Sequence, residues 1–291
     1  MATKIELKNL CFCGSGKKYS ECHGRYDDAI KLASQRGRCA PQRSMLKTKE
    51  QLEGIRRSAA INRAVLDAVS EKICEGMTTW EVDKIVYEKT KAMGGIPAPL
   101  DYEGFPKSVC VSVNDEVCHG IPSRKRVLKS GDIVNVDAST ILNGYYSDSS
   151  RMFCIGEVSP ENKRLVDVTR EAVYAGLEKV RPLGFLGDVG AAVNSYAKKH
   201  GYSVVRQIGG HGIGLEFHED PWVSFVSRAG TGMLLVPGLC FTIEPMINMG
   251  RSAIYTDKGN GWTVYTSDHK PSAQWEIMVV VTEDGYEVLC D

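Results

Sequence analysis

The chain has 291 residues, 43% of them hydrophobic, and its 36 Lys and Arg balance its 36 Asp and Glu. This length allows one large domain with an appendage, and a net charge of zero gives the whole chain no electrostatic bias toward nucleic acid or membrane surfaces. No apolar run approaches the roughly 18 residues that span a membrane, and no signal-peptide pattern opens the chain, so we expect a soluble, cytoplasmic protein without a membrane partner.

The ten cysteines fall into two groups. Seven are scattered singly, several of them in apolar runs, which favours reduced, buried thiols over disulfides. The other three stand with a histidine in one short segment, as Cys11, Cys13, Cys22 and His23. Three thiolates and an imidazole make a normal tetrahedral zinc set, and such small units fold around their metal. We therefore predict a structural zinc; the alternative is a cysteine-rich disordered leader.

The N-terminal segment is basic. Residues 1–45 contain nine Lys and Arg against four Asp and Glu, a net charge of +5 that leaves −5 for the remainder. Lys17, Lys18 and Arg25 surround the predicted zinc ligands, where they could meet nucleic-acid phosphate or simply form a solvated basic surface. Residues 34–46 have no hydrophobic period and are interpreted as a linker. We place a domain boundary between residues 1–44 and residues 45–291.

Two capping boxes mark the first helices of the larger segment. Thr48 with Gln51 predicts a helix that ends near residue 76, and Thr78 with Glu81 predicts a second helix that stops at Gly94 and its neighbour. Strands are expected from about residue 108 to 155. This order of a long helix, a shorter helix and strands is the first of two similar units.

The second unit repeats that order. Ser159-Pro160 is an N-cap followed by proline at the first helical position, and it opens a long helix to about residue 180. A shorter helix over 188–200 closes with Gly201, and strands fill the rest of the chain. Because such halves often pack face to face around a site, we expect both units to supply ligands.

Residues 132–151 predict a β-hairpin, because β-branched and apolar residues run up to the turn signal Asn143-Gly144. With that turn, Asp137 lies opposite Ser150 and Asp148 lies opposite Ser139, so both aspartates point to the same face. Two carboxylates aimed at one point repel each other unless a proton or a cation lies between them. The alternative is a solvated strand face, but apolar neighbours indicate a buried strand: Ile133, Val134 and Val136.

Three further candidate ligands lie in the second unit. His211 stands among glycines, which permit the close backbone approach that a ligand site needs; a structural histidine is the alternative. Glu244 ends an apolar strand, and Glu276 lies inside the most apolar strand of the chain, where a charged group almost requires a partner.

The five candidates have a common chemistry. Four carboxylates and one imidazole carry too much negative charge for one divalent ion and suit two ions that share bridging carboxylates. Their ligand atoms favour Mn, Fe, Co or Zn. Two such ions bind and activate a water molecule and stabilise the oxyanion formed when it attacks an amide. The residues themselves therefore predict two-metal hydrolysis, with these ligands: Asp137, Asp148, His211, Glu244 and Glu276.

Residues 45–291 resemble a type I methionine aminopeptidase in several specific motifs. These are the run from Phe105 to Pro122, the hairpin aspartates, Gly-His211-Gly-Ile-Gly, Phe-Thr-Ile-Glu244-Pro and Gln274-x-Glu276. The resemblance implies the α+β pita-bread fold, in which a pseudo-twofold antiparallel sheet flanked by helices holds the metals. It also implies the reaction, which is removal of the initiator methionine from nascent polypeptides whose second residue is small.

The resemblance further implies roles for single residues. Asp137 binds one ion through both oxygens, Asp148 and Glu276 bridge the two ions, and His211 and Glu244 complete the second. Glu244 also moves protons between water and leaving amine. The positions assigned to substrate contact are His119, His218, Pro99, Tyr102, Phe105, Cys110, Phe217, Trp262 and Gln274. Many bacterial members carry cysteine where this chain has Pro99, so the pocket rim is expected to differ.

Two other sites follow from resemblance. Asn114, Ser272 and the carbonyl of Glu116 match a monovalent-cation site of some relatives. The cysteine segment resembles the SEC-C motif, the short zinc motif at the C-terminus of the bacterial secretion ATPase, in all four ligands. Longer relatives use N-terminal extensions to approach the ribosome, and ribosome contact through this basic unit is a hypothesis.

Three alternatives compete with this interpretation. X-Pro peptidases of the same fold share the five ligands but usually carry a large N-terminal domain, whereas about 45 residues precede this catalytic segment. Type II methionine aminopeptidases have a helical insertion for which the 33 positions between His211 and Glu244 leave no room. Some pita-bread proteins have lost their metals and serve as binding modules, but all five ligands are intact here.

Overall fold

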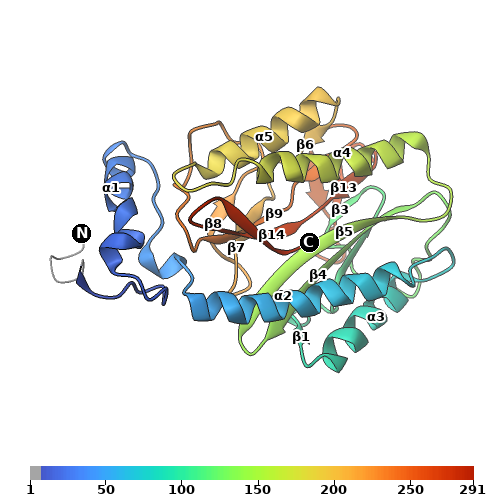
Figure 1. Ribbon diagram of the computed structural model, residues 1–291. Coiled ribbons are helices and arrows are strands. Elements are labelled where there is room, and N and C mark those ends of the chain that lie inside the picture. Colours follow the sequence, from blue (N-terminus) through green and yellow to red (C-terminus); the bar gives the residue numbers. More distant parts are fainter. Residues whose placement is uncertain (1–7) are drawn as a thin grey trace.

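The computed structural model describes residues 8–291. Helices α2 (Lys49–Ser70) and α3 (Thr79–Ala92) form one pair, and α4 (Pro160–Leu177) and α5 (Leu186–Lys199) form the other. The two pairs lie along opposite sides of the strands, and the N-terminal unit lies beyond one end of α2 (Figure 1). Each pair is followed by strands in the chain order, which confirms the prediction of two successive helix–helix–strand units.

The predicted caps start the helices. Thr48 Oγ1 accepts the backbone N–H of Gln51 while the Gln51 side chain accepts the N–H of Thr48, and Thr78 with Glu81 repeats this pattern. Ser159 caps α4, which continues with proline at its first position. Satisfying the free N–H groups of a first turn in this way stabilises a helix by about 1 kcal/mol per cap.

The predicted end of α2 was wrong. The helix stops at Ser70 rather than near residue 76, and the chain then turns. Gly76 has a φ of 86° and donates its N–H to the Leu128 carbonyl at 2.8 Å, so a tertiary hydrogen bond replaces the last helical turn. Ile73 still packs on the core between α2, α3 and the hairpin, which explains why its spacing continued the helical pattern.

The strands form four antiparallel sheets. The first half builds one from β1 (Ile96–Pro97), β4 (Ile133–Leu142), β2 (Cys110–Val113) and β5 (Tyr145–Cys154). The second half builds a five-stranded sheet in the order β15 (Tyr286–Cys290), β14 (Ile277–Val281), β9 (Cys240–Ile243), β7 (Gly210–Gly212) and β8 (Glu219–Val223). Two small sheets complete the set: β13 (Ser272–Gln274), β10 (Met246–Asn248) and β6 (Ser203–Val204); β11 (Ile254–Thr256), β12 (Val264–Thr266) and β3 (Glu116–Cys118).

The central hairpin confirms the predicted register. Asn143 and Gly144 occupy the turn with φ values of 52° and 81°, as a tight two-residue connection requires. Asp137 pairs with Ser150, and Ser139 pairs with Asp148. The two halves of the molecule meet on this hairpin, because Ser150 of β5 and Glu276 exchange both backbone hydrogen bonds, at 3.3 and 3.2 Å.

The N-terminal unit contains short turns at Tyr19–Glu21 and His23–Tyr26 and the helix α1 (Asp27–Gln35). Residues 36–46 are not a free linker as expected. They form a strap that includes the turn Arg43–Met45 and pairs with the larger segment through Cys39 with Met233 and Leu46 with Leu239. No helix among residues 8–291 is both long and apolar enough to cross a membrane.

Candidate active site

A cavity of about 840 Å³ collects the predicted metal ligands from both halves of the fold. The hairpin strands β4 and β5 contribute two aspartates, β7 contributes the histidine, and the two glutamates follow β9 and precede β14. All five side chains line this cavity: Asp137, Asp148, His211, Glu244 and Glu276. The structure therefore brings together residues that lie up to 139 positions apart in the sequence.

The ligand atoms are close enough to share ions. His211 Nε2 lies 3.8 Å from Asp148 Oδ2 and 3.5 Å from Glu244 Oε1. One ligand atom each of Asp148, His211 and Glu276 lies within 4.8 Å of the others. Separations of this size suit side chains that surround a cation of about 2.0–2.2 Å ligand distance.

Buried negative charge dominates the electrostatics of the cluster. Burial raises the pKa of Asp137 to about 6 and that of Glu244 to about 8. The pKa values of Asp148 and Glu276 lie well above the usual range, because burial and then the neighbouring carboxylates disfavour ionisation. Glu276 Oε1 is buried without a hydrogen-bond partner among the described residues. An unpaired buried carboxylate oxygen and mutual repulsion are what divalent cations would relieve, so the donor set fits two metal ions.

Hydrogen bonds orient the ligands. His211 Nδ1 lies 2.9 Å from the Gly212 carbonyl, an arrangement that assigns the proton to Nδ1 and leaves the Nε2 lone pair for a metal. Burial also lowers the pKa of His211 to about 3, which keeps the imidazole neutral. Thr242 Oγ1 donates to Glu244 Oε1 at 2.7 Å and accepts the N–H of His211 at 3.0 Å.

Two residues that orient the ligands, Ser139 and Thr242, were not predicted from the sequence. Ser139 Oγ donates to Asp148 Oδ1 at 2.7 Å, and Thr242 joins Glu244 to His211. Strand alternation could have identified both, because Ser139 faces Asp148 across the hairpin and Thr242 is two residues before Glu244.

The glycines around His211 have a different purpose from the one expected. A Cβ on Gly210 would lie 2.6 Å from the Thr242 carbonyl of β9, and one on Gly212 would lie 2.2 Å from the Asp220 carbonyl of β8. The close approach is therefore to neighbouring strands rather than to a ligand. Glycine lets β7 fit between β8 and β9, and this places His211 over the cavity.

Six of the nine positions assigned to substrate contact make up the predicted methionine pocket, which forms one part of the cavity. Its six positions all line the cavity: Pro99, Tyr102, Phe105, Cys110, Phe217 and Trp262. Edge-to-face ring pairs hold the walls, with centroids 4.9 Å apart for Tyr102 and Phe217 and 5.2 Å apart for Phe105 and Trp262. Burial raises the pKa of Cys110 well above its usual value, so its thiol is a neutral, soft wall.

The two candidate substrate histidines also line the cavity. His218 stacks on Phe217 with ring centroids 4.4 Å apart, and its Nδ1 lies 2.9 Å from the Tyr102 hydroxyl. Burial lowers the pKa of His119 to about 4 and also lowers that of His218. Both rings are therefore neutral at pH 7. Gln274 lies outside the cavity lining, and its amide nitrogen donates to Glu244 Oε2 at 3.2 Å.

A buried ion pair that the sequence did not reveal supports the loop carrying these aromatic groups. Lys47, whose side chain is 1% exposed, contacts Glu219 through Nζ. Glu219 Oε1 in turn accepts the backbone N–H groups of Leu215 and Glu216, at 2.7 and 3.0 Å. The loop before His218 is thereby fixed from the strap that leaves the N-terminal unit.

The residues of the predicted monovalent-cation site lie near one another. The Asn114 carbonyl accepts the N–H of Ser272 at 2.8 Å. The Asn114 amide is bonded to Asp132 and Ile133, and the Glu116 carboxylate accepts the N–H of Val113. Because these side chains are engaged with the protein, backbone carbonyls remain as the donor atoms, and the site stays a prediction.

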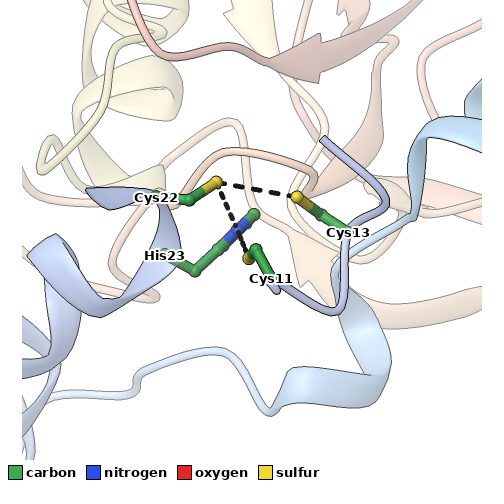
Figure 2. A group of neighbouring side chains, drawn as sticks. All are labelled: Cys11, Cys13, Cys22 and His23. Atoms are coloured by element: carbon green, nitrogen blue, oxygen red, sulfur yellow. Dashed lines mark hydrogen bonds between the residues drawn. The ribbon is translucent and has the colours of Figure 1, made fainter. Parts of the chain in front are cut away.

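The N-terminal ligands converge as a separate cluster (Figure 2). Cys13 Sγ and Cys22 Sγ are 3.6 Å apart, and His23 Nδ1 lies 3.2 Å from Cys11 Sγ and 3.4 Å from Cys22 Sγ. A zinc ion with bonds of about 2.3 Å to sulfur has tetrahedral S–S edges of roughly 3.7 Å, so the spacing fits. His23 Nε2 contacts the Pro237 carbonyl at 2.9 Å, which orients Nδ1 toward the thiols.

Comparisons with known proteins agree with this geometry. The sequence pattern of metallopeptidase family M24 matches residues 53–283, and the SEC-C motif matches residues 8–25. The chain is 47% identical to methionine aminopeptidase A of Synechocystis over 84% of this chain and 96% of the relative. It is 42% identical to the methionine aminopeptidase of Chlamydia trachomatis over 98% of both chains, so that relative also matches the N-terminal unit.

Solved structures confirm the α+β pita-bread fold. The crystal structure of methionine aminopeptidase from Rickettsia prowazekii aligns with a TM-score of 0.82 at 45% identity, covering 84% of this chain and 98% of that chain. The prolidase from Pyrococcus horikoshii aligns with a TM-score of 0.67 at 22% identity, covering 85% of this chain and 63% of that chain. The second similarity concerns the fold alone.

Proposed function

Because the chain belongs to metallopeptidase family M24, we propose that its cavity binds the first residues of a polypeptide and cleaves the bond after an N-terminal methionine. The protein is a metal-dependent methionine aminopeptidase, as the motifs predicted. It removes the initiator methionine from new chains whose second residue is small. The observation that carries this proposal is the convergence of five ligands on one cavity beside a pocket of aromatic walls and one thiol.

The four carboxylates and the imidazole would hold two divalent ions, and the family resemblance assigns the shared ligand positions to Asp148 and Glu276. Such ions lower the pKa of a bound water molecule and stabilise the negative charge that develops on the attacked carbonyl. The ligand atoms suit Mn, Fe, Co or Zn. Thr242 and Ser139 hold Glu244 and Asp148 in place, so these carboxylates need little reorganisation to bind the ions.

The protein's own groups position the substrate. Glu244 lines the cavity and is held by Thr242, so its carboxylate is placed to accept a proton from the attacking water and pass it to the leaving amine. Neutral His218 is oriented through Tyr102 to donate a hydrogen bond toward the scissile carbonyl, and His119 contacts the next amide. The aromatic walls and the Cys110 thiol enclose a methionine side chain without requiring a polar partner.

Hydrolysis of Met-Ala-Ser and of an X-Pro dipeptide, each with and without chelator, tests the function. We expect cleavage of Met-Ala-Ser alone, loss of that activity with chelator, and recovery on adding Mn or Co. Cleavage of the X-Pro dipeptide instead would assign the chain to the proline-specific peptidases. Absence of cleavage with every divalent ion would favour a binding module.

The N-terminal cluster supports two further parts of the proposal, and two others rest on the larger segment. Its spacing suits a structural zinc, and its match to the SEC-C motif points the same way. Ribosome contact rests on the basic residues of the segment, although Lys17 and Arg25 already pair with Glu283 of the larger segment. A cytoplasmic location follows from an activity on newly made chains. A monovalent ion at Asn114, Ser272 and the carbonyl of Glu116 is also part of the proposal.

A further inference from the structure

A second cavity of about 380 Å³ adjoins the active site. The two cavities share Asp220 and Trp222 in their walls. The second cavity is mainly apolar in its remaining side chains, which include Pro221, Leu186, Met233 and Cys39 of the N-terminal strap. Asp220 and Trp222 therefore separate the cavity of the predicted metal ligands from a second, smaller recess.

Trp222 occupies the boundary between the two cavities. Trp222 is 56% exposed, second only to Leu10 among the large apolar residues of the described chain. The indole lies against Gly209, where an added Cβ would be 3.0 Å from its Nε1, and Gly209 is two residues before the metal-ligand candidate His211. A tryptophan at this position offers a large apolar ring with a polar N–H to a bound chain, and it lines the cavity that holds the predicted metal ligands.

The strand that carries Trp222 also suits an extended partner. β8 is the edge strand of its sheet, and its side chains alternate, with Pro221 and Val223 buried and Asp220 and Trp222 exposed on the other face. Successive exposed side chains of an edge strand form a shelf along which an extended peptide can lie. The shelf leads from the first cavity to the second.

We propose that this shelf is a subsite for the substrate's own chain beyond the scissile bond, with Trp222 and the second cavity receiving an apolar side chain of about the fourth or fifth residue. The inference rests on the proposed function, because a polypeptide whose methionine lies among the aromatic walls must leave the first cavity. Asp220 and Trp222 line both cavities and mark the path between them, and the apolar lining of the second cavity favours an apolar side chain.

Two pentapeptides that differ only in their last two side chains, with a tripeptide as reference, test the subsite. The set is Met-Ala-Ser, Met-Ala-Ser-Gly-Gly and Met-Ala-Ser-Leu-Leu, assayed with the intact metal-loaded protein. We expect kcat/KM to be about three- to tenfold higher for the leucine peptide than for the glycine peptide, mainly through a lower KM, as a single apolar contact at a protein surface provides. Equal values for the two pentapeptides would overturn the proposal.

Variants assign the preference to Trp222. In Trp222→Ala the ratio of leucine to glycine peptide should fall to about one, and in Trp222→Leu part of the preference should remain. Tyr87→Ala is the control, because it removes an exposed aromatic group of α3 that is distant in sequence from Trp222. This variant should keep the wild-type ratio. A ratio that survives in Trp222→Ala would also overturn the subsite. Failure of the proposed function would look different, because Met-Ala-Ser itself would not be cleaved.

Discussion

The protein contains two clusters of metal-ligand type that are built in opposite ways. The N-terminal cluster takes its four ligands from 13 consecutive residues, Cys11 to His23. The central cluster takes its five from residues 137–276, on strands of both halves. Ligands from one short segment are positioned by few tertiary contacts, so we expect metal binding and folding to be one event in the N-terminal unit. The central set is held by sheets that the apolar core already stabilises.

The two clusters also differ in charge. Burial raises the pKa of the Cys22 thiol to about 11, so without metal this thiol stays neutral. For Cys13, burial acts in the same direction, but hydrogen bonds led by Ser15 lower the pKa overall. Hydrogen bonds also reach Glu244 and Asp148, but the pKa values of these central carboxylates stay raised. Glu276 lacks a hydrogen-bond partner at Oε1 among the described residues. The raised pKa values indicate that the central cluster opposes folding of the metal-free protein, whereas we expect the N-terminal cluster to depend on its metal for order.

The largest effect is expected from Glu276→Gln. An amide cannot bridge two cations as a carboxylate does, and removing even hydrogen-bond partners of metal ligands costs about 10–100-fold. We expect kcat for Met-Ala-Ser to fall more than ~100-fold, while thermal stability without metal is equal or higher because one buried carboxylate is gone. Steady-state kinetics and thermal melts measure both.

Glu216→Gln is the matched control, because Glu216 is an exposed carboxylate on the rim of the same cavity. It should keep a rate close to that of the wild type. A near-normal rate for Glu276→Gln would remove Glu276 from the ligand set and break the contrast between the two clusters.

The parts that sequence predicted are those with a local or periodic signature. Cap residues fixed the starts of α2, α3 and α4, and the Asn143-Gly144 turn fixed the hairpin register that aligns Asp137 with Asp148. Convergence of His211, Glu244 and Glu276 on that hairpin was expected from residue chemistry and then from family resemblance. Strand alternation alone cannot show that both halves face one cavity.

The parts that sequence missed depend on contacts between distant segments. The Ser150–Glu276 bridge joins the halves, Lys47 reaches Glu219, and Trp222 lies between two cavities. No local residue spacing indicates these features, because each depends on contacts between segments that lie far apart in the chain. The end of α2 was missed for the same reason, since the Leu128 carbonyl that binds Gly76 lies 52 residues away.

The second prediction concerns pH in the metal-free protein. Asp137 and Glu244 have folded-state pKa values of about 6 and about 8, above the ordinary values of 3.8 and 4.5. Each carboxyl binds its proton more tightly in the folded state, so this contribution to stability is full below about pH 4 and is lost as pH rises through about 6 to 8. For Asp137 alone the loss is about 3 kcal/mol.

Thermal melts in EDTA at pH 5 and pH 8 measure this effect, with Glu276→Gln as the comparison. That variant keeps the N-terminal unit, so any contribution of the thiols is common to both proteins. We expect a smaller drop between pH 5 and pH 8 in the variant, and we expect added Mn to abolish the drop in the wild type. A wild-type melting temperature that does not fall toward pH 8 would show that the central carboxylates do not oppose folding.

The smallest effect on turnover is expected from Cys13→Ser. Serine binds zinc far more weakly than a thiolate, so one zinc per chain should be lost and residues 8–35 should become sensitive to protease. Catalysis should stay within about twofold, because the five central ligands come from the larger segment. Cys154→Ser, which changes an exposed free thiol, is the control and should change neither zinc content nor protease sensitivity.

The same variant shows whether the two clusters are independent. Lys47 directly follows the strap, and its partner Glu219 holds the loop before His218. If loss of zinc loosened this strap, KM for Met-Ala-Ser would rise in Cys13→Ser while kcat stayed the same, because the loop contacts substrate rather than metal. A rise of that kind would mean that the local cluster helps to position the distant one. An unchanged KM would show that the Leu46–Leu239 pairing, which lies between the zinc unit and Lys47, is enough to hold the strap in place.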